Sequence, residues 1–363
     1  MAISVYEIRS GLSQMPQEHS AAFLGAVEAA LGDKLEPVSL NAFIKEPFGL
    51  IYVSSGGSEG LFLQQFSSYD KPCFLLTSGD SNSLAASMEI LAYLRQHGRK
   101  GEILHGDVEN IARRIRVLSR AARARGRLGG LRLGVVGKPS DWLIASELDR
   151  AACKQKLGVE VVDIPMEELL AANAASPAVE NEWTTNLRSL GYDKGEMDKA
   201  LSIYSALKAI IVKHNLGAIT VRCFDLLGSV CTTGCLALAI LNAEGIYAWC
   251  EGDVPSTLSM TILGELSGKP VFMCNPSRIN TREGHVVLAH CTLPVNMPRE
   301  MTLTTHFESG IGVAIAGTIP EGTCTVLRRA RIWDDITQRR EIFRKTCAKH
   351  RFAARRYRSR LMT

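Results

Sequence analysis

The stretch AITVRCFDLLGSVCTTGCLALAILNAEGIYAWCEGDVP, residues 218–255, indicates the fold class of the chain. Two short apolar runs, 218–221 and 246–249, stop at residues that ionise, and a helical segment, Leu236–Leu241, lies between them. The runs at 270–273 and 286–289 follow the same pattern. Such runs are typical of buried strands in α/β proteins, which bring side chains to one edge of a sheet, where these folds place their sites.

The N-terminal half of the chain also alternates strands and helices. Leu50–Ser54 and Cys73–Thr77 are short apolar strands, and Ser83–Gln96 is an amphipathic helix with serine at its start and Gly98 beyond its end. After the basic linker Arg120–Gly130, a second α/β unit is expected. It comprises strands Leu131–Val136 and Val159–Ile164 and helices Asp141–Lys156, Met166–Ala175 and Lys194–Asn215.

The sequence therefore predicts an α/β protein with two Rossmann-like α/β domains followed by a β-rich C-terminal domain. The expected boundaries are 1–125 for the first α/β domain, 131–216 for the second and 217–330 for the β-rich domain of catalytic type. Residues 331–363 form a basic tail that we expect to be disordered or helical, because it lacks a clean apolar period.

Composition indicates a soluble globular protein. Hydrophobic residues make up 46% of the 363 residues and charged residues 22%. No apolar run approaches the roughly 20 residues that cross a bilayer, and the N-terminus does not read as a secretory signal, so we expect a cytoplasmic protein without a membrane partner. The ten cysteines fall in apolar segments and are read as a reduced core. Cys231 and Cys235 have no second pair at zinc-finger spacing, which argues against a structural zinc site.

The net charge of +5 comes from one end of the chain. Residues 328–363 carry 13 Lys and Arg but only three acids, and the rest of the chain carries 29 basic and 34 acidic side chains, a net charge of −5. The tail contains no recognisable motif. Composition therefore does not indicate a nucleic-acid partner.

Candidate catalytic residues follow the apolar runs. In CEGDVP, Glu251 and Asp253 are two apart, so in an extended segment both reach one pocket. The alternative is that they only complement the dipole of the next helix. Asp225 is either a third carboxylate of this site or the ion-pair partner of Arg222. His290 is either a structural histidine or a ligand or acid–base group.

Further residues are candidates for substrate binding. Glu59 lies in SSGGSEG (54–60), which matches no phosphate-binding motif and is otherwise a tight turn. Ser140, Asp141 and Trp142 lie in GKPSDWLIAS (137–146), where Trp142 is either a core anchor or a flat face for a ligand. The pair His306 and Glu308, spaced as on one face of a strand, is expected to form a wall of the same cleft. Strand neighbours point to opposite faces, which argues against a nucleophile pair of Cys291 and His290.

Seven segments, in order over about residues 50–327, resemble the L-fucose/L-arabinose isomerase-like family, in its sugar-isomerase-related branch. They are GGSEG (56–60), SNSLAASMEILAYL (81–94), GKPSDWLIAS (137–146), RCFDLLGSVCTTGCLALAILNAEG (222–245), CEGDVPSTLSM (250–260), LAHCTLP (288–294) and THFESGIG (305–312).

The resemblance implies a metal-dependent aldose–ketose isomerase that acts on a monosaccharide through a cis-enediolate, in a homo-oligomer such as a trimer or hexamer. It implies Mn²⁺ (or Mg²⁺) held by Asp253, with Glu251 beside it as ligand or base and Asp225 as the acid that precedes this motif. His290 and His306 are then polarising or substrate-binding groups. The family's C-terminal metal histidine has no counterpart in this sequence.

Two other functions remain open. One is a non-catalytic sugar-binding relative that keeps the pocket, and the other is a metal-dependent sugar epimerase or lyase that uses the same enediolate. Metal content and ketose formation distinguish the three.

Overall fold

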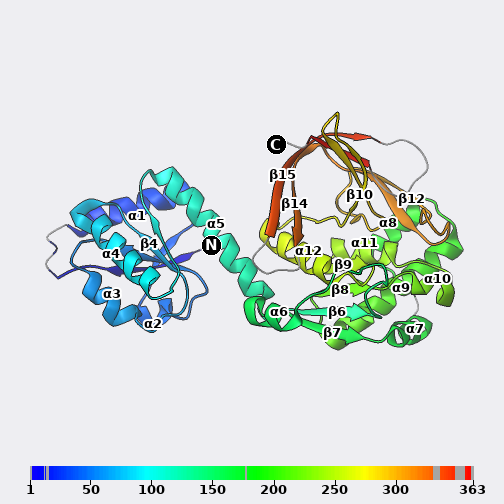
Figure 1. Ribbon diagram of the computed structural model, residues 1–363, viewed down its shortest axis with the longest axis horizontal. Helices are drawn as coiled ribbons and strands as arrows, with labels where there is room; N and C mark the ends of the chain where they lie inside the picture. Colours follow the sequence, from blue (N-terminus) through cyan, green and yellow to red (C-terminus); the bar gives the residue numbers. More distant parts are fainter. Residues whose placement is uncertain are drawn as a thin grey trace. The chain divides into compact units, whose positions relative to one another are not determined.

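The chain folds into two compact units, Met1–Gly126 and Arg127–Thr363. This computed structural model (Figure 1) describes residues 2–11, 13, 16–175, 178–329, 336–347 and 356–360.

The first unit is built on a five-stranded parallel sheet of strand order β2-β1-β3-β4-β5. Its central strand is fully buried, as expected for a parallel sheet covered on both faces. The strand order reverses between β1 and β3, as in doubly wound folds. The strands are β1 (Ile3–Ile8), β2 (Leu35–Pro37), β3 (Gly49–Val53), β4 (Cys73–Leu76) and β5 (Gly101–Leu104).

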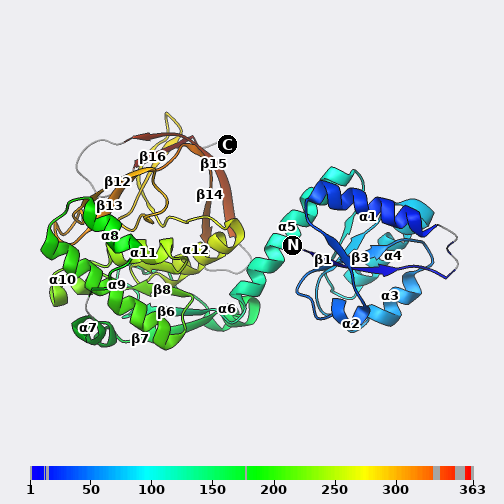
Figure 2. The same ribbon diagram turned by 180° about the vertical axis from the view of Figure 1, so that it is seen from behind.

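Helices cover both faces of this sheet (Figures 1 and 2). One apolar core joins the sheet to α1 and α5, and a second joins it to α2, α3 and α4. The helices are α1 (Gln17–Leu31), α2 (Leu40–Phe43), α3 (Glu59–Phe66), α4 (Ser83–Gln96) and α5 (Val108–Leu128), with a 3₁₀ turn at Asp80–Asn82. The predicted helix at 83–96 is confirmed, while the expected basic linker mostly continues α5 as far as Leu128.

The second unit contains a parallel sheet of order β7-β6-β8-β9. Its strands are β6 (Arg132–Val136), β7 (Glu160–Ile164), β8 (Ala218–Val221) and β9 (Tyr247–Cys250). Because β8 pairs with β6 in parallel register, the boundary expected at 216/217 falls inside this sheet. The order reverses between β6 and β8, so the loops after these two strands flank the crevice where such sheets bind ligands.

Seven helices surround this sheet within the described residues. Helices α7, α9 and α11 share one apolar core, and α6 and α12 share another with the opposite face. The helices are α6 (Arg150–Leu157), α7 (Met166–Ala175), α8 (Glu182–Ser189), α9 (Lys194–His214), α10 (Asp225–Val230), α11 (Cys235–Ala243) and α12 (Val254–Ser267).

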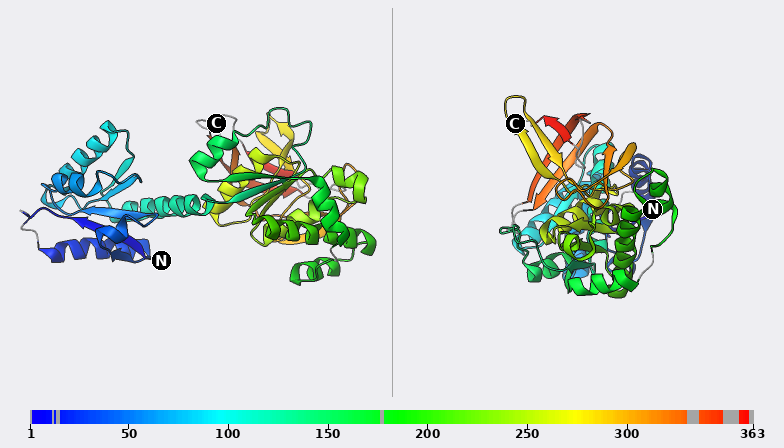
Figure 3. Two further views of the ribbon diagram at one scale, coloured as in Figure 1. Left: turned by 90° about the horizontal axis from the view of Figure 1, so that it is seen from below. Right: turned by 90° about the vertical axis from the view of Figure 1, so that its right-hand side faces the viewer.

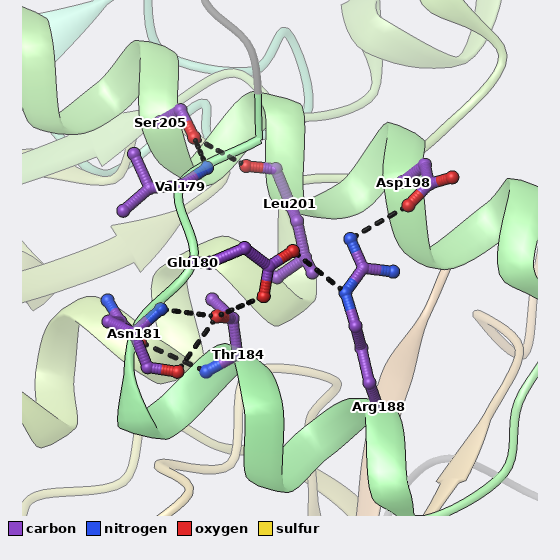
Figure 4. Close-up of polar contacts among 8 residues, drawn as sticks. All are labelled: Val179, Glu180, Asn181, Thr184, Arg188, Asp198, Leu201 and Ser205. Carbon is purple, nitrogen blue, oxygen red and sulfur yellow. Dashed lines mark hydrogen bonds and ion pairs between the residues drawn. The ribbon is translucent and has the colours of Figure 1, made fainter.

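Side-chain caps fix where several of these helices begin. Figure 4 shows the start of α8, where Asn181 and Thr184 form a capping box. Arg188 of the same helix pairs with Glu180 and with Asp198 of α9, so it ties the two helices together. The helix expected at 141–156 begins only at Arg150, because the side chain of Asp149 caps it there and the residues before it form a loop.

Antiparallel strands complete the second unit, as the side views show (Figure 3). They are β10 (Asn275–Asn280), β11 (His285–Ala289), β12 (Glu300–Thr304), β13 (Ala314–Thr318), β14 (Gly322–Arg329), β15 (Ile336–Cys347) and β16 (Arg356–Arg360). One sheet has the order β10-β11-β16-β15-β14, and β12 pairs with β13. Helix α11 contacts β9 and β13, and α12 contacts β9 and β14, so both connect the parallel and antiparallel parts.

These strands correct two expectations. The apolar run at 270–273 forms no strand. In the basic tail, residues 336–347 and 356–360 are strands rather than helical or disordered, because they pair with β14 and β11 through the backbone, which needs no apolar period. The remainder of the tail, 331–335, 348–355 and 361–363, lies outside the described residues. The predicted fold class, α/β with two parallel sheets followed by a β-rich region, is confirmed.

Among the described helices, none has the length and apolar character that a membrane crossing requires.

Candidate functional site

A pocket of about 430 Å³ opens in the second unit beyond the carboxyl ends of β8, β9 and β11. This volume lies within the range typical of small-molecule sites. Its wall combines ionisable groups, thiols and aromatic rings, among them Glu251, His290, Cys291, His306 and Glu308. The sequence pattern of apolar runs that stop at ionisable residues therefore leads to one cavity.

A tight turn after β9 presents Glu251 to the pocket. Glu251 and Gly252 both have positive φ, 68° and 64°, so the backbone reverses here instead of continuing as a strand. A Cβ on Gly252 would lie 2.5 Å from the carbonyl oxygen of Lys138, a backbone atom. Glycine is therefore required where the two loops meet. The N–H of Ser140 donates to the carbonyl of Glu251 at 2.9 Å, which holds the strained residue in place.

Asp253 has a structural role that differs from the position of Glu251 in the pocket wall: it caps a helix. One carboxylate oxygen accepts from the backbone N–H of Ser256 at 2.9 Å and the other from its hydroxyl at 2.7 Å. Asp253 is thus the N-cap of α12, and it is not among the residues that line the pocket. The expectation that Glu251 and Asp253 lie on one face of an extended segment is wrong, because the turn separates them.

Asp225 and Asp141 meet at Arg222, at the crevice between β6 and β8. The guanidinium donates to Asp225 at 3.0 Å, to Asp141 at 2.7 Å and to the carbonyl of Pro139 at 2.8 Å. Hydrogen bonding from Arg222 lowers the pKa of Asp141 to about 2, and the same partners raise the pKa of Arg222. The ion-pair alternative for Asp225 is the one observed.

His290 lies at the base of the pocket. Its Nε2 is 3.6 Å from a carboxylate oxygen of Glu251 and 3.7 Å from the sulfur of Cys250. Its Nδ1 is 3.0 Å from the hydroxyl of Thr292. Burial lowers the pKa of His290, but the Cys291 thiol and then Glu251 raise it by more, to about 10. Cys291 and Glu251 thus favour the protonated form of the ring.

Four buried cysteines form a group beside this histidine: Cys250 and Cys291 approach its ring, Cys235 hydrogen-bonds Cys291, and Cys223 hydrogen-bonds Cys250. The sulfur of Cys291 is 3.7 Å from Nδ1 of His290. Hydrogen bonds from the thiols of Cys235 and Cys250, and then His290, lower the pKa of Cys291 well below its usual value despite burial. The two neighbours do meet, because they follow the end of β11 and are not pleated, contrary to the expectation for a strand.

His306 and Glu308 both line the pocket, but from a turn and not from a strand. Nδ1 of His306 accepts from the backbone N–H of Ser309 at 3.3 Å. A backbone N–H only donates, so the proton of the neutral ring is assigned to Nε2. The rings of His306 and Phe224 meet edge to face at 5.6 Å between centroids, and those of Phe224 and Trp142 meet edge to face at 5.2 Å. Trp142, half exposed, thus continues the aromatic wall outward.

The expected Mn²⁺ or Mg²⁺ site does not fit these positions. In the part of the chain that the structure describes, two groups of possible metal ligands have donor atoms within 4.8 Å of one another, and neither contains Glu251, Asp253 or Asp225. The two groups are Cys250, His290 and Cys291, and Cys235, Cys291 and His306. Thiols and imidazoles favour softer ions than Mn²⁺ or Mg²⁺.

The structure thus brings together Glu251, His290, His306 and Glu308. It places Asp253 in a cap, and Asp225 and Asp141 in ion pairs. The Ser140 side chain is buried, and its hydroxyl has no hydrogen-bond partner among the described residues. Glu59 begins α3 of the first unit, and its role in a site stays a prediction.

Sequence reasoning missed Cys250 and Cys291 as wall residues of the pocket, together with Phe224, Asn275, Ser277 and Phe307. Like Glu251 and His290, the two cysteines lie at the ends of apolar runs. This position in the sequence is the feature that could have identified them as pocket residues.

Comparison with known proteins points to sugar isomerases. The chain is 23% identical over 279 residues to the sulfoquinovose isomerase of Alkalicoccus urumqiensis, covering 70% of this chain and 62% of that protein. It is 24% identical over 264 residues to the enzyme of Priestia aryabhattai, covering 68% and 58%. For the enzyme of Clostridium sp. (strain MSTE9) the identity is 26% over 246 residues, covering 61% and 53%.

The chain therefore spans less than two thirds of the length of the curated relatives it matches. No family model matches it. Over most of its length, the chain is similar to enzymes named as sugar isomerases.

Proposed function

We propose that the pocket binds a monosaccharide and interconverts its aldose and ketose forms. The observation that carries this proposal is the contact of Glu251 with His290, 3.6 Å apart, inside a cavity of about 430 Å³. A carboxylate and an imidazole at this separation are the two kinds of group that proton transfer within a sugar requires. The similarity to sulfoquinovose isomerases supports the same reaction class.

The chemistry needs one group that moves a proton and others that stabilise charge. In an open-chain aldose, a base removes the proton from C2 to give a cis-enediolate; a proton is then returned to C1 while the proton of the O2 hydroxyl passes to O1, which gives the ketose. Glu251 is the proposed base, because its carboxylate lies in the wall and its backbone is fixed by Ser140. His306 also lines the cavity, and its Nε2–H is the proposed donor to an acceptor such as the substrate's O1 or O2.

The aromatic wall suits the other part of a sugar. Phe224 and Phe307 line the cavity, and Trp142 extends the wall outward from Phe224. Flat rings pack against the C–H faces of sugars, while Glu308 accepts hydrogen bonds from hydroxyl groups.

The test is a panel of pentoses, hexoses, 6-deoxyhexoses and sulfoquinovose incubated with the protein in deuterated water. Ketose formation with deuterium at C1 is the expected result, since an enediolate exchanges its proton with solvent. Glu251→Gln should lower the rate by about 10²–10⁴-fold, the usual contribution of a general base. Glu300→Gln, on the exposed strand β12, is the matched control and should leave the rate unchanged.

Other outcomes separate the alternatives. Deuterium at C2 of the recovered aldose, without ketose, would indicate an epimerase. Saturable binding without exchange would indicate a sugar-binding protein, and either result would overturn the isomerase. The homo-oligomer implied by the family resemblance is a separate proposal, checked by light scattering, where a monomeric mass would contradict it.

A further inference from the structure

The base of the pocket contains an unusual concentration of soft donor atoms. The donor atoms of Cys250, Cys291 and His290 lie within 4.8 Å of one another. All three residues are buried, at 1%, 4% and 6% exposure, and all three line the pocket. These three residues line a cavity large enough for a ligand, so their thiols and imidazole can contact a molecule or ion bound there.

The spacing is close to that of a tetrahedral metal centre. Around Zn²⁺, with Zn–S of about 2.3 Å and Zn–N of about 2.0–2.1 Å, neighbouring ligand atoms are roughly 3.5–3.8 Å apart. The sulfur of Cys250 is 3.7 Å from Nε2 of His290, whereas Cys291 approaches the other ring nitrogen, Nδ1, at 3.7 Å. With one donor atom taken from each residue, the three donors lie within 4.8 Å of one another. The donors would therefore need to draw together by roughly 1 Å at most to enclose such an ion.

We propose that Cys250, Cys291 and His290 bind one thiophilic divalent cation, Zn²⁺, with the fourth position open toward the pocket. Two thiolates and one imidazole, with a free position, form a donor set known from catalytic zinc centres. This site differs in both residues and ion from the carboxylate site for Mn²⁺ that the family resemblance implies, and it replaces that expectation.

The hydrogen bonds made by the two histidines favour Cys250, Cys291 and His290 over the other group of possible ligands. The hydroxyl of Thr292 is 3.0 Å from Nδ1 of His290 and is positioned to accept the proton there, so a metal would displace the other ring proton and bind at Nε2. In the other triad, Nδ1 of His306 is occupied by the N–H of Ser309, so its Nε2 carries the proton and offers no lone pair. Glu251, 3.6 Å from Nε2 of His290, lies beside the open position.

This inference bears on the proposed function but is tested apart from it. An ion in this place would put positive charge next to Glu251, where the enediolate of the proposed reaction develops negative charge. Metal stoichiometry and spectra need no substrate. If the isomerase proposal fails, these measurements still decide whether the metal site exists. If no metal binds, the sugar assays still decide whether the protein is an isomerase.

The experiment uses the full chain, reduced and stripped of metal, and titrates it with Zn²⁺ and with Co²⁺ as a coloured substitute. We expect one Zn²⁺ per chain and, for Co²⁺, strong tetrahedral bands with a sulfur-to-cobalt charge-transfer band. The unaltered protein thus tests thiolate ligation directly, without a variant that has to fold. A Co²⁺ complex without the charge-transfer band, or tighter binding of Mn²⁺ than of Zn²⁺, would overturn the proposal.

Variants then identify the donors. Cys250→Ser and Cys291→Ser should each raise the dissociation constant for Zn²⁺ more than about 100-fold, beyond the 10–100-fold expected for the near-isosteric Thr292→Val. Cys235→Ser should raise it by less than Cys250→Ser or Cys291→Ser, because Cys235 supplies a donor only to the other triad and the serine hydroxyl can still hydrogen-bond Cys291. Cys73→Ser, equally buried but in the first unit, is the control for the loss of a thiol. Unchanged affinity in both Cys250→Ser and Cys291→Ser would refute the assignment.

Discussion

Gly252 is the position where the turn that carries Glu251 tolerates no side chain. Its φ is +64°, and an added Cβ would lie 2.5 Å from the carbonyl oxygen of Lys138 and 2.9 Å from Cα of Pro139. Both are backbone atoms, so no side-chain rotation relieves the overlap. Gly252→Ala should therefore push the loop after β6 away from the turn after β9. This movement should also break the hydrogen bond from the N–H of Ser140 to the carbonyl of Glu251.

Gly268 provides the matched comparison. It ends the same helix that Asp253 begins, its φ is +62°, and no atom of the described part of the chain lies within 4 Å of its added Cβ. Gly268→Ala thus measures the cost of the left-handed backbone alone, about 1–2 kcal/mol. Gly252→Ala adds the cost of overlap in a packed site, about 1–3 kcal/mol, for a total of about 2–5 kcal/mol.

Tryptophan fluorescence during urea unfolding is the assay. All four tryptophans lie after residue 126, so the signal reports the second unit and not the first. We expect the free energy of unfolding to fall more for Gly252→Ala than for Gly268→Ala, by about 1–3 kcal/mol. Equal losses in the two variants would show that the loops do not meet as described.

Three further predictions concern the second unit. Leu238→Ala, in the fully buried centre of α11, should lower its free energy of unfolding by about 2–5 kcal/mol in the same assay. Asn181→Ala should lower it by about 1 kcal/mol, because the capping box of α8 is lost; a neutral result would contradict the cap. Hydrogen bonds from Arg150 lower the pKa of Asp163, so this pair stabilises the fold above the unfolded pKa of about 4, and its contribution disappears as pH falls. Asp163→Asn should cost a few tenths of a kcal/mol at pH 7, since the pair is largely exposed, and nothing near pH 2; a pH-independent loss would contradict this.

Much of the fold could be read from the sequence, because local patterns determine it. Apolar runs such as those of β3 and β8 are buried on both faces, and the helix 83–96 has an apolar period of its own. Pairing between distant segments leaves no such local pattern. The inclusion of β8 and β9 in the sheet of β6, and the pairing of the basic tail with β14, depend on partners far away in the chain.

The sequence predicts where the site lies but not which residues act together in it. Residues after apolar runs do meet at one cavity, and Glu251 and His290 were found in this way. Asp253 and Glu251 were expected to act together, yet two consecutive left-handed residues separate them, and dihedral angles of this kind are not visible in a spacing rule. Cys250 and Cys291 stand apart in the sequence, where each has the pattern of a core residue. They form a group with His290 only because strand ends 40 residues apart converge.

The left-handed backbone of Glu251 has a consequence for anyone who selects this protein for heat resistance. Glycine at 251 would relieve roughly 1–2 kcal/mol of torsional penalty, so a screen that rewards only melting temperature would favour it. The same change would delete the carboxylate that faces His290. At residue 251, higher thermal stability and the proposed catalytic carboxylate therefore exclude each other. Variants selected at this position should be treated as inactive until their turnover has been measured.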